Sequence, residues 1–191
     1  MAKVKVSEYS KTKYMAFLQD ELLEKLNIAL LRDEKFIDVD EEIITKLNQD
    51  VEAQKLKNDK INSCATLNNQ GISFEKDGDT VNAIKVYEKN ILDEYPATHS
   101  YDRLIKLYRK LKQYQDELRI LNLAVKVFSK ENARRFNKAI SDPKNAKHIS
   151  DLQTANEACM QFKGDDGWFI YVPYPVMNYI EQITKCESKL K

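Results

Sequence analysis

The side chains that could carry out acid–base, nucleophilic or metal chemistry are few and scattered along this chain of 191 residues. The two histidines, His99 and His148, belong to no recognisable metal-binding motif, and Cys159 has no base near it in the sequence. Residues 164–167 read GDDG, which is too short for a calcium loop and lacks its terminal glutamate. The sequence also contains no glycine-rich phosphate loop. We therefore expect no catalytic residues, no metal and no cofactor, and hence a protein that is not an enzyme.

The three cysteines, Cys64, Cys159 and Cys186, are widely spaced and odd in number, and no CxxC pair occurs. This usage is typical of free thiols in a reducing compartment, and we interpret the cysteines as buried structural residues. Residues 1–26 contain lysines but no continuous apolar run, so they resemble neither a signal peptide nor a membrane span. These features predict a cytoplasmic protein with no membrane partner.

A run of basic residues interleaved with tyrosines could bind phosphates. Its basic members are Arg103, Lys106, Arg109, Lys110 and Lys112, and its tyrosines are Tyr101, Tyr108 and Tyr114. Such a mixture can bind nucleic acid. The tyrosines, however, recur at helical spacing and are expected inside the protein, and Asp102, Asp116 and Glu117 dilute the charge. Since the whole chain has 31 basic and 30 acidic residues, the sequence disfavours nucleic acid as the partner.

The composition indicates which elements must position these side chains. Charged residues make up 32% of the chain, whereas glycine and proline number only 4 each, a balance typical of an all-α protein. Apolar residues recur every three or four positions over residues 12–31, which predicts an amphipathic helix. Its buried stripe is expected to contain Met15, Leu18, Leu22, Leu26 and Leu30.

Two further helices are predicted before residue 77. Asp38 and Glu41 have the spacing of a capping box and would begin a helix over residues 40–58. A separate helix over residues 62–76 carries Gly71 on its buried face. Because glycine costs about 1 kcal/mol relative to alanine inside a helix, Gly71 predicts a close approach by another helix.

A second helix and then a near-copy of the whole hairpin follow. Gly78 is placed to end the first helix with a positive φ, Asp79 can cap the next helix, and Pro96 closes the unit. Residues 98–128 show the same pattern again at a shift of about 34 residues, which is the signature of a two-helix repeat.

The stretch at about residues 64–128 resembles two units of the tetratricopeptide repeat (TPR) family. In the first unit the matching residues are Gly71, Phe74, Ala83 and Tyr87, with Leu67 in place of tryptophan. In the second unit they are Tyr101, Leu104, Tyr108, Leu121 and Ala124. Asn90 and Glu117 depart from the pattern, because each stands where a small residue is usual. The resemblance implies an all-α fold of helical hairpin repeats, a TPR-like α-solenoid, with N-terminal helices and a C-terminal capping region.

The repeat does not continue into a third unit. We predict further helices, which cover residues 130–141, 146–162 and 176–190. The sequence WFIYVPYP at residues 168–175 should be extended because prolines interrupt it. We favour the interpretation that it fills the open end of the repeats over that of an exposed anchor. The expected domains are an N-terminal helical segment (1–61), two TPR-like repeats (62–128) and a C-terminal helical cap (129–191).

The resemblance implies a non-catalytic adaptor that binds a protein or peptide on the concave surface of the repeats. The residues expected to face that partner are Asn68, Ile72, Glu75, Asp102, Lys106, Arg109 and Lys110. An ordinary solvated helix surface is the competing interpretation for each of them. The alternative function is a regulator that acts on nucleic acid or with a DNA-binding partner. Self-association through the Trp168 segment is a third hypothesis.

Overall fold

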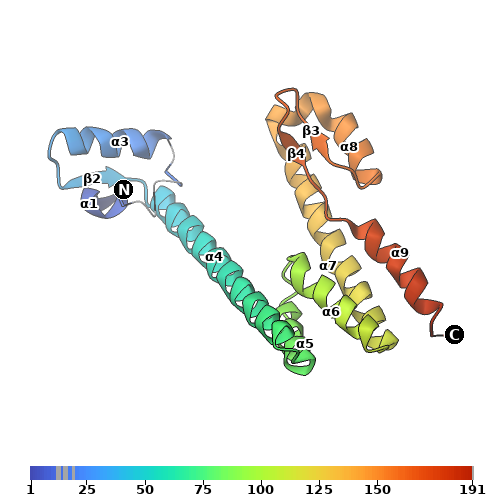
Figure 1. The fold of residues 1–191 in the computed structure, drawn as a ribbon. Helices are drawn as coiled ribbons and strands as arrows, with labels where there is room; N and C mark the ends of the chain where they lie inside the picture. The colour runs from blue at the N-terminus through green and yellow to red at the C-terminus, as the bar shows by residue number, and fades with distance from the viewer. Residues whose placement is uncertain (12–13, 15–16, 19, 191) are drawn as a thin grey trace. The chain divides into compact units, whose positions relative to one another are not determined.

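The computed structural model of the chain is mostly helical (Figure 1). It describes residues 1–11, 14, 17–18 and 20–190. The chain divides into two compact units, Met1–Ser63 and Cys64–Lys191. Helix α4 (Glu41–Lys76) contributes residues to both units. Within the described part of the chain, no helix is long and apolar enough to cross a membrane.

The first unit folds around a small hydrophobic core of its own. Its elements are β1 (Ala2–Lys5), α1 (Val6–Tyr9), α3 (Asp20–Leu31), β2 (Phe36–Val39) and the start of α4. Strands β1 and β2 pair antiparallel with Val4 opposite Ile37, which ties the N-terminal residues into the unit. The core residues are Val4, Val6, Tyr9, Tyr14, Leu22, Leu26, Ala29, Val39 and Leu47.

The first predicted helix agrees with the structure only in part. Its predicted start at residue 12 and the stripe residue Met15 lie outside the described residues. Leu26 is buried as predicted, but Leu30 is exposed and Ala29 is buried in its place. Each helical residue turns by about 100°, so a stripe that passes through position 29 leaves position 30 well to one side.

Helix α4 differs from the prediction in its cap and in its length. The capping box with Asp38 is wrong, because Asp38 lies in β2. Asp40 precedes the helix instead, and its Oδ1 accepts a hydrogen bond from the backbone N–H of Glu42 at 2.9 Å. The predicted interruption between residues 58 and 62 is also wrong, since α4 is continuous there. That stretch holds neither glycine nor proline, so nothing in it breaks a helix.

The second unit consists of two helical hairpins and a C-terminal region. Its elements are the end of α4, α5 (Thr80–Ile91), α6 (Thr98–Lys110), α7 (Tyr114–Ser141), the 3-10 helix η1 (Pro143–His148), α8 (Ile149–Glu157), β3 (Phe162–Lys163), β4 (Phe169–Tyr171) and α9 (Val176–Glu187). Helix α5 packs against α6, α6 against α7, and α7 against α9 (Figure 1). The main core lies between these four helices.

The turn between α4 and α5 has the residues and geometry that the sequence predicts. Gly78 adopts a φ of +76°, a value that residues with a side chain rarely reach. The Asp79 carboxylate then caps α5 by accepting a hydrogen bond from the backbone N–H of Asn82 at 3.1 Å. The predicted close approach at Gly71 is also confirmed, since the buried ring of Tyr87 lies directly against this glycine.

The region after the second hairpin departs from the prediction in two places. The helix predicted over residues 130–141 is not separate, because it forms the second half of α7. The helix predicted over residues 146–162 is right only over residues 149–157, which form α8, and its predicted end is wrong. Short helices η1 and α8 occupy residues 143–157, and Phe162 then lies in β3, paired with Tyr171 of β4. The final predicted helix corresponds to α9.

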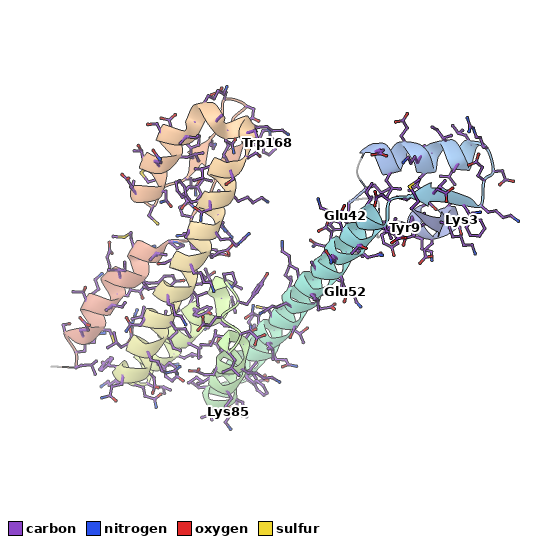
Figure 2. All side chains as sticks on the ribbon, turned by 180° about the vertical axis from the view of Figure 1, so that it is seen from behind. Lys3, Tyr9, Glu42, Glu52, Lys85 and Trp168 are labelled. Carbon is purple, nitrogen blue, oxygen red and sulfur yellow. The ribbon has the colours of Figure 1, made fainter. Side chains whose placement is uncertain are left out.

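The aromatic segment at residues 168–175 is extended, as predicted, but it does not bury its first two residues. Trp168 is 76% exposed and projects from the β3–β4 hairpin (Figure 2), and Phe169 is 51% exposed. Tyr171, by contrast, is 2% exposed and packs in a second core with Leu152 of α8. The expectation that Trp168 and Phe169 fill the end of the repeats is therefore wrong.

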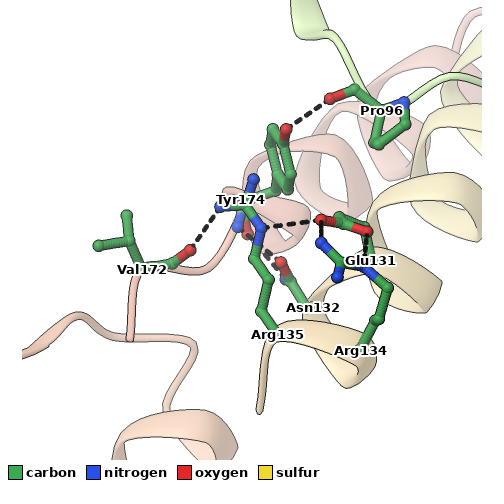
Figure 3. Close-up of polar contacts among 7 residues, drawn as sticks. All are labelled: Pro96, Glu131, Asn132, Arg134, Arg135, Val172 and Tyr174. Atoms are coloured by element: carbon green, nitrogen blue, oxygen red, sulfur yellow. Dashed lines mark hydrogen bonds and ion pairs between the residues drawn. The ribbon is translucent and has the colours of Figure 1, made fainter. Parts of the chain in front are cut away.

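Tyr174 fixes the end of this segment to α7 (Figure 3). Its backbone N–H donates to Asn132 Oδ1 at 2.7 Å, and its carbonyl oxygen accepts from Asn132 Nδ2 at 3.1 Å. Its hydroxyl donates to the carbonyl oxygen of Pro96, and the guanidinium of Arg135 lies 4.3 Å from the centre of its ring. These contacts hold the chain in place immediately before α9 begins.

Candidate partner-binding surface

The seven residues predicted to face a partner lie on α4 and α6, and the structure places them in three settings. Two belong to networks that join helices, two contact α9, and three make no such contact with any residue that the structure describes. These groups are, in that order, Asn68 and Glu75, Asp102 and Arg109, and Ile72, Lys106 and Lys110. Sequence spacing alone does not distinguish which of the seven are available to a partner, so the side-chain contacts decide what each can do.

Asn68 belongs to a polar network that joins α4, α5 and α6. The amide nitrogen of buried Asn90 lies 2.8 Å from Asn68 Oδ1, 2.9 Å from Ser100 Oγ and 3.1 Å from the carbonyl oxygen of Cys64. Ser100 Oγ also donates to Asn68 Oδ1 at 2.7 Å. Because buried polar groups need such partners, the network fixes how the three helices pack. The carbonyl group of Asn68 is thus used inside the unit.

Glu75 forms a second junction between the same helices. Its carboxylate accepts hydrogen bonds from the Tyr87 hydroxyl at 2.8 Å and from Arg103 Nε at 2.8 Å, and Arg103 Nη2 pairs with its other oxygen. The hydrogen bonds from Arg103 lower the pKa of the Glu75 carboxyl. Burial, and then the bond to Glu75, raise the pKa of the Tyr87 hydroxyl. Glu75 is therefore an ionised structural group at neutral pH.

Helix α9 lies against the face of α6 that carries Asp102 and Arg109. The Tyr179 hydroxyl donates to Asp102 Oδ1 at 2.8 Å, and Arg109 Nη2 donates to Gln182 Oε1 at 2.8 Å. Burial, and then the bond to Asp102, raise the pKa of the Tyr179 hydroxyl. The surface that α6 presents is consequently shared with α9, and a partner there would meet side chains of both helices.

Lys106 and Lys110 are exposed on α6 and, together with Arg109, lie on one face of the helix because residues three and four apart are neighbours. Next to Arg109, a cavity of about 470 Å³ opens between α6, α7 and α9. Its lining residues are Arg109, Glu117, Gln182, Lys185, Cys186, Ser188 and Lys189. Three basic side chains and one carboxylate line the cavity, so it favours negatively charged groups.

Glu117 is the buried charge of this cavity, with 1% of its surface exposed. Its Oε1 accepts a hydrogen bond from Arg109 Nε at 2.6 Å, which holds the guanidinium in place. Its Oε2 receives no hydrogen bond from any described residue. Burial, and then the nearby charge of Glu117, raise the pKa of the Cys186 thiol. Glu117 therefore positions the Arg109 guanidinium at the cavity.

Sequence reasoning missed half of this surface. Gln182 and Lys185 belong to α9 and Lys189 follows it, about 70 residues beyond α6, and no repeat pattern points to them. Glu117 did give a signal, because it occupies a position of the repeat pattern where a small residue is usual. Asn90 gave the same signal, and both are buried polar groups in the structure. A polar residue at a repeat position that is usually small and buried thus indicates a buried polar group that the repeat pattern does not explain.

Of the remaining candidates for chemistry, His148 lies beside Asp165 of the GDDG stretch, with its Nε2 3.5 Å from Oδ1. Among residues 1–11, 14, 17–18 and 20–190, no group of three or more His, Cys, Asp or Glu side chains could hold a metal ion. Comparison of the chain with protein-family models, with curated proteins and with solved structures gives no match. The inference of function therefore starts from the surface of α6 and α9.

Proposed function

We propose that the second unit is a non-catalytic adaptor that binds an acidic segment of a protein partner along α6 and α9. The observation that carries this proposal is the basic cavity of about 470 Å³ beside Arg109. Exposed Lys106 and Lys110 extend the positive charge along α6. Glu117 and Gln182 already hold Arg109 in place, and such preorganisation reduces the entropy lost when a ligand binds.

A TPR-like arrangement is part of the same proposal. It is supported by two successive hairpins, α4–α5, joined by the Gly71–Tyr87 and Glu75–Tyr87 contacts, and α6–α7, and by α9, which packs on α7 and contacts α6 where a following repeat would lie. Cys64 and Cys186 are buried and Cys159 is half-buried, all three as free thiols, which supports a reducing, cytoplasmic setting. We propose no catalytic role for any of these residues.

The test compares two double charge reversals with the same spacing on different helices. Lys106→Glu/Lys110→Glu changes the proposed surface, and Lys85→Glu/Lys89→Glu changes exposed lysines on α5, where Figure 2 labels Lys85. Tagged parent and variants are used to capture partners from lysate of the native organism, with quantitative mass spectrometry. Peptides selected by display on the parent provide the second measurement.

We expect the α6 variant to lose partners that the α5 variant retains, and the selected peptides to be rich in aspartate and glutamate. Arg109 is left unchanged because reversal of its charge would leave Glu117 buried without its partner, which costs about 3–5 kcal/mol. If both variants retain the same partners, or if the selected peptides carry no acidic bias, the proposed surface is wrong.

A further inference from the structure

The far end of α7 carries a second groove, separate from the cavity beside Arg109. A cavity of about 460 Å³ is lined by the C-terminal part of α7 and by β4, and a neighbouring one of about 350 Å³ is lined by η1 and the β3–β4 hairpin. Both are lined by Asp142, Asn145 and Ile170, so they form one continuous groove along this end of the unit. Trp168 stands in its lining and is 76% exposed.

The charges along this groove are mostly positive. Its basic residues are Arg134, Arg135, Lys138, Lys144 and Lys147, and its acidic residues are Asp142, Asp165 and Asp166. Each carboxylate already has a hydrogen-bond or ion-pair partner within the protein. Asp142 accepts from the backbone N–H of Lys144 at 3.0 Å, Asp166 accepts from that of Trp168 at 3.0 Å, and Asp165 pairs with Lys147. The ammonium groups of Lys138 and Lys144 have no hydrogen bond or ion pair with any described residue.

The two arginines at one end of the groove are held in fixed orientations (Figure 3). Glu131 accepts two hydrogen bonds from Arg134, each at 2.7 Å, and one from Arg135 Nε at 3.0 Å. Arg135 Nη1 also donates to the carbonyl oxygen of Val172 at 2.8 Å. A guanidinium that is fixed in this way needs little further ordering when it binds a phosphate.

One aromatic ring, that of Trp168, lies at the other end of the groove, and its indole is open to solvent on the hairpin. A large exposed indole has no role in the packing of the hairpin, whose core side chain is Tyr171. A flat apolar ring beside unpaired ammonium groups matches a ligand that alternates aromatic faces with negative charges.

We propose that this groove binds single-stranded nucleic acid, with phosphates at Lys138, Lys144 and Arg134 and a base stacked on Trp168. Bases offer a π-face to the indole whatever their identity, so the binding should tolerate many sequences. An acidic peptide would satisfy the lysines but would leave the indole without a stacking partner. A duplex would keep its bases stacked on one another and out of reach of Trp168.

Trp168 is the single tryptophan of the chain and therefore reports on its own contact. An oligothymidylate of about twelve nucleotides, a common site size for stacking proteins, is titrated at low salt into the full-length protein. We expect quenching of the indole fluorescence and a parallel rise in the anisotropy of a labelled oligonucleotide. The logarithm of the affinity should fall with the logarithm of the salt concentration with a slope of about −0.7 per phosphate contact.

Variants and ligands separate the parts of the proposal. Lys138→Glu/Lys144→Glu and Trp168→Ala should each weaken binding ten-fold or more, whereas Lys85→Glu/Lys89→Glu on α5 should leave it unchanged, and Trp168→Phe should retain part of it. An abasic strand with the same phosphates should bind more weakly and cause no quenching. Absence of quenching and of anisotropy change at low salt would overturn the proposal, as would equal binding of the abasic strand, of a polyglutamate peptide or of a duplex. Since this groove and the α6–α9 surface share no residue, failure of one proposal leaves the other intact.

Discussion

A Cβ atom on residue 71 would lie 2.3 Å from Cε1 of Tyr87, far closer than two carbon atoms can approach. Gly71 in α4 and Tyr87 in α5 are thus a matched pair, and the ring lies where an alanine methyl group would be. Tyr87 has little room to move, because its ring is fully buried and its hydroxyl is bonded to Glu75.

Gly71→Ala is expected to destabilise the second unit despite the better helix propensity of alanine. Alanine gains about 1 kcal/mol within a helix, but overpacking typically costs about 1–3 kcal/mol, and the rigid surroundings here favour the upper end. Urea unfolding followed by circular dichroism measures the difference. Ser73→Ala, at an exposed position of the same helix, is the control and should be neutral or slightly stabilising. A Gly71→Ala protein as stable as this control would contradict the packing described.

Asn90→Ala should cost about 1–3 kcal/mol, because it removes the buried hydrogen bonds that the Asn90 amide gives to Asn68, Ser100 and the carbonyl oxygen of Cys64. The midpoint of thermal unfolding measures this loss. Asn122→Ala removes an exposed asparagine of α7 and serves as its match. Should both variants melt together, the network around Asn90 contributes nothing to stability.

Glu75→Gln gives a prediction about pH. The pKa of Glu75 is lowered on folding from 4.5, so its stabilisation is complete above about pH 4.5 and disappears as the pH falls through the lowered pKa. At pH 7, Glu75→Gln should therefore lower the free energy of unfolding, measured by urea denaturation, relative to the parent. The loss should be at most about 2 kcal/mol, because Arg103 is partly exposed. The two proteins should converge in acid. Glu181→Gln, on the exposed face of α9, should show no such dependence.

Trp168 and Tyr171 are close in the sequence but differ in burial. Substitution of the buried residue should therefore destabilise the protein much more than substitution of the exposed one. Tyr171→Ala removes a ring that is 2% exposed and should cost about 3–5 kcal/mol. Trp168→Ala should change stability by no more than about 0.5 kcal/mol. Chemical denaturation of both variants checks this contrast. A large loss in Trp168→Ala would mean that the indole packs on the protein and is not available to a ligand.

Local sequence signals sufficed for the hairpins of the second unit. Gly78 and Asp79 specify the turn between α4 and α5, because a positive φ and a helix cap depend on only a few adjacent residues. Gly71 likewise predicted a close helix contact, because its cost within a helix needs a compensating reason. The capping box at Asp38 failed for a complementary reason. The pairing of β2 with β1, a partner more than 30 residues away, overrides a local cap signal.

By itself, then, the sequence determined that the chain is mostly helical, where the hairpins turn and which polar residues break the repeat pattern. The tertiary structure alone decided which faces are covered. Helix α9 shares the surface of α6 through Gln182 and Tyr179, and the second groove joins Lys138 of α7 with Trp168 of the hairpin. Helical periodicity and turn chemistry act over a few residues, whereas the cover of a face depends on packing between segments 30 to 80 residues apart, roughly the range at which local patterns carry no information.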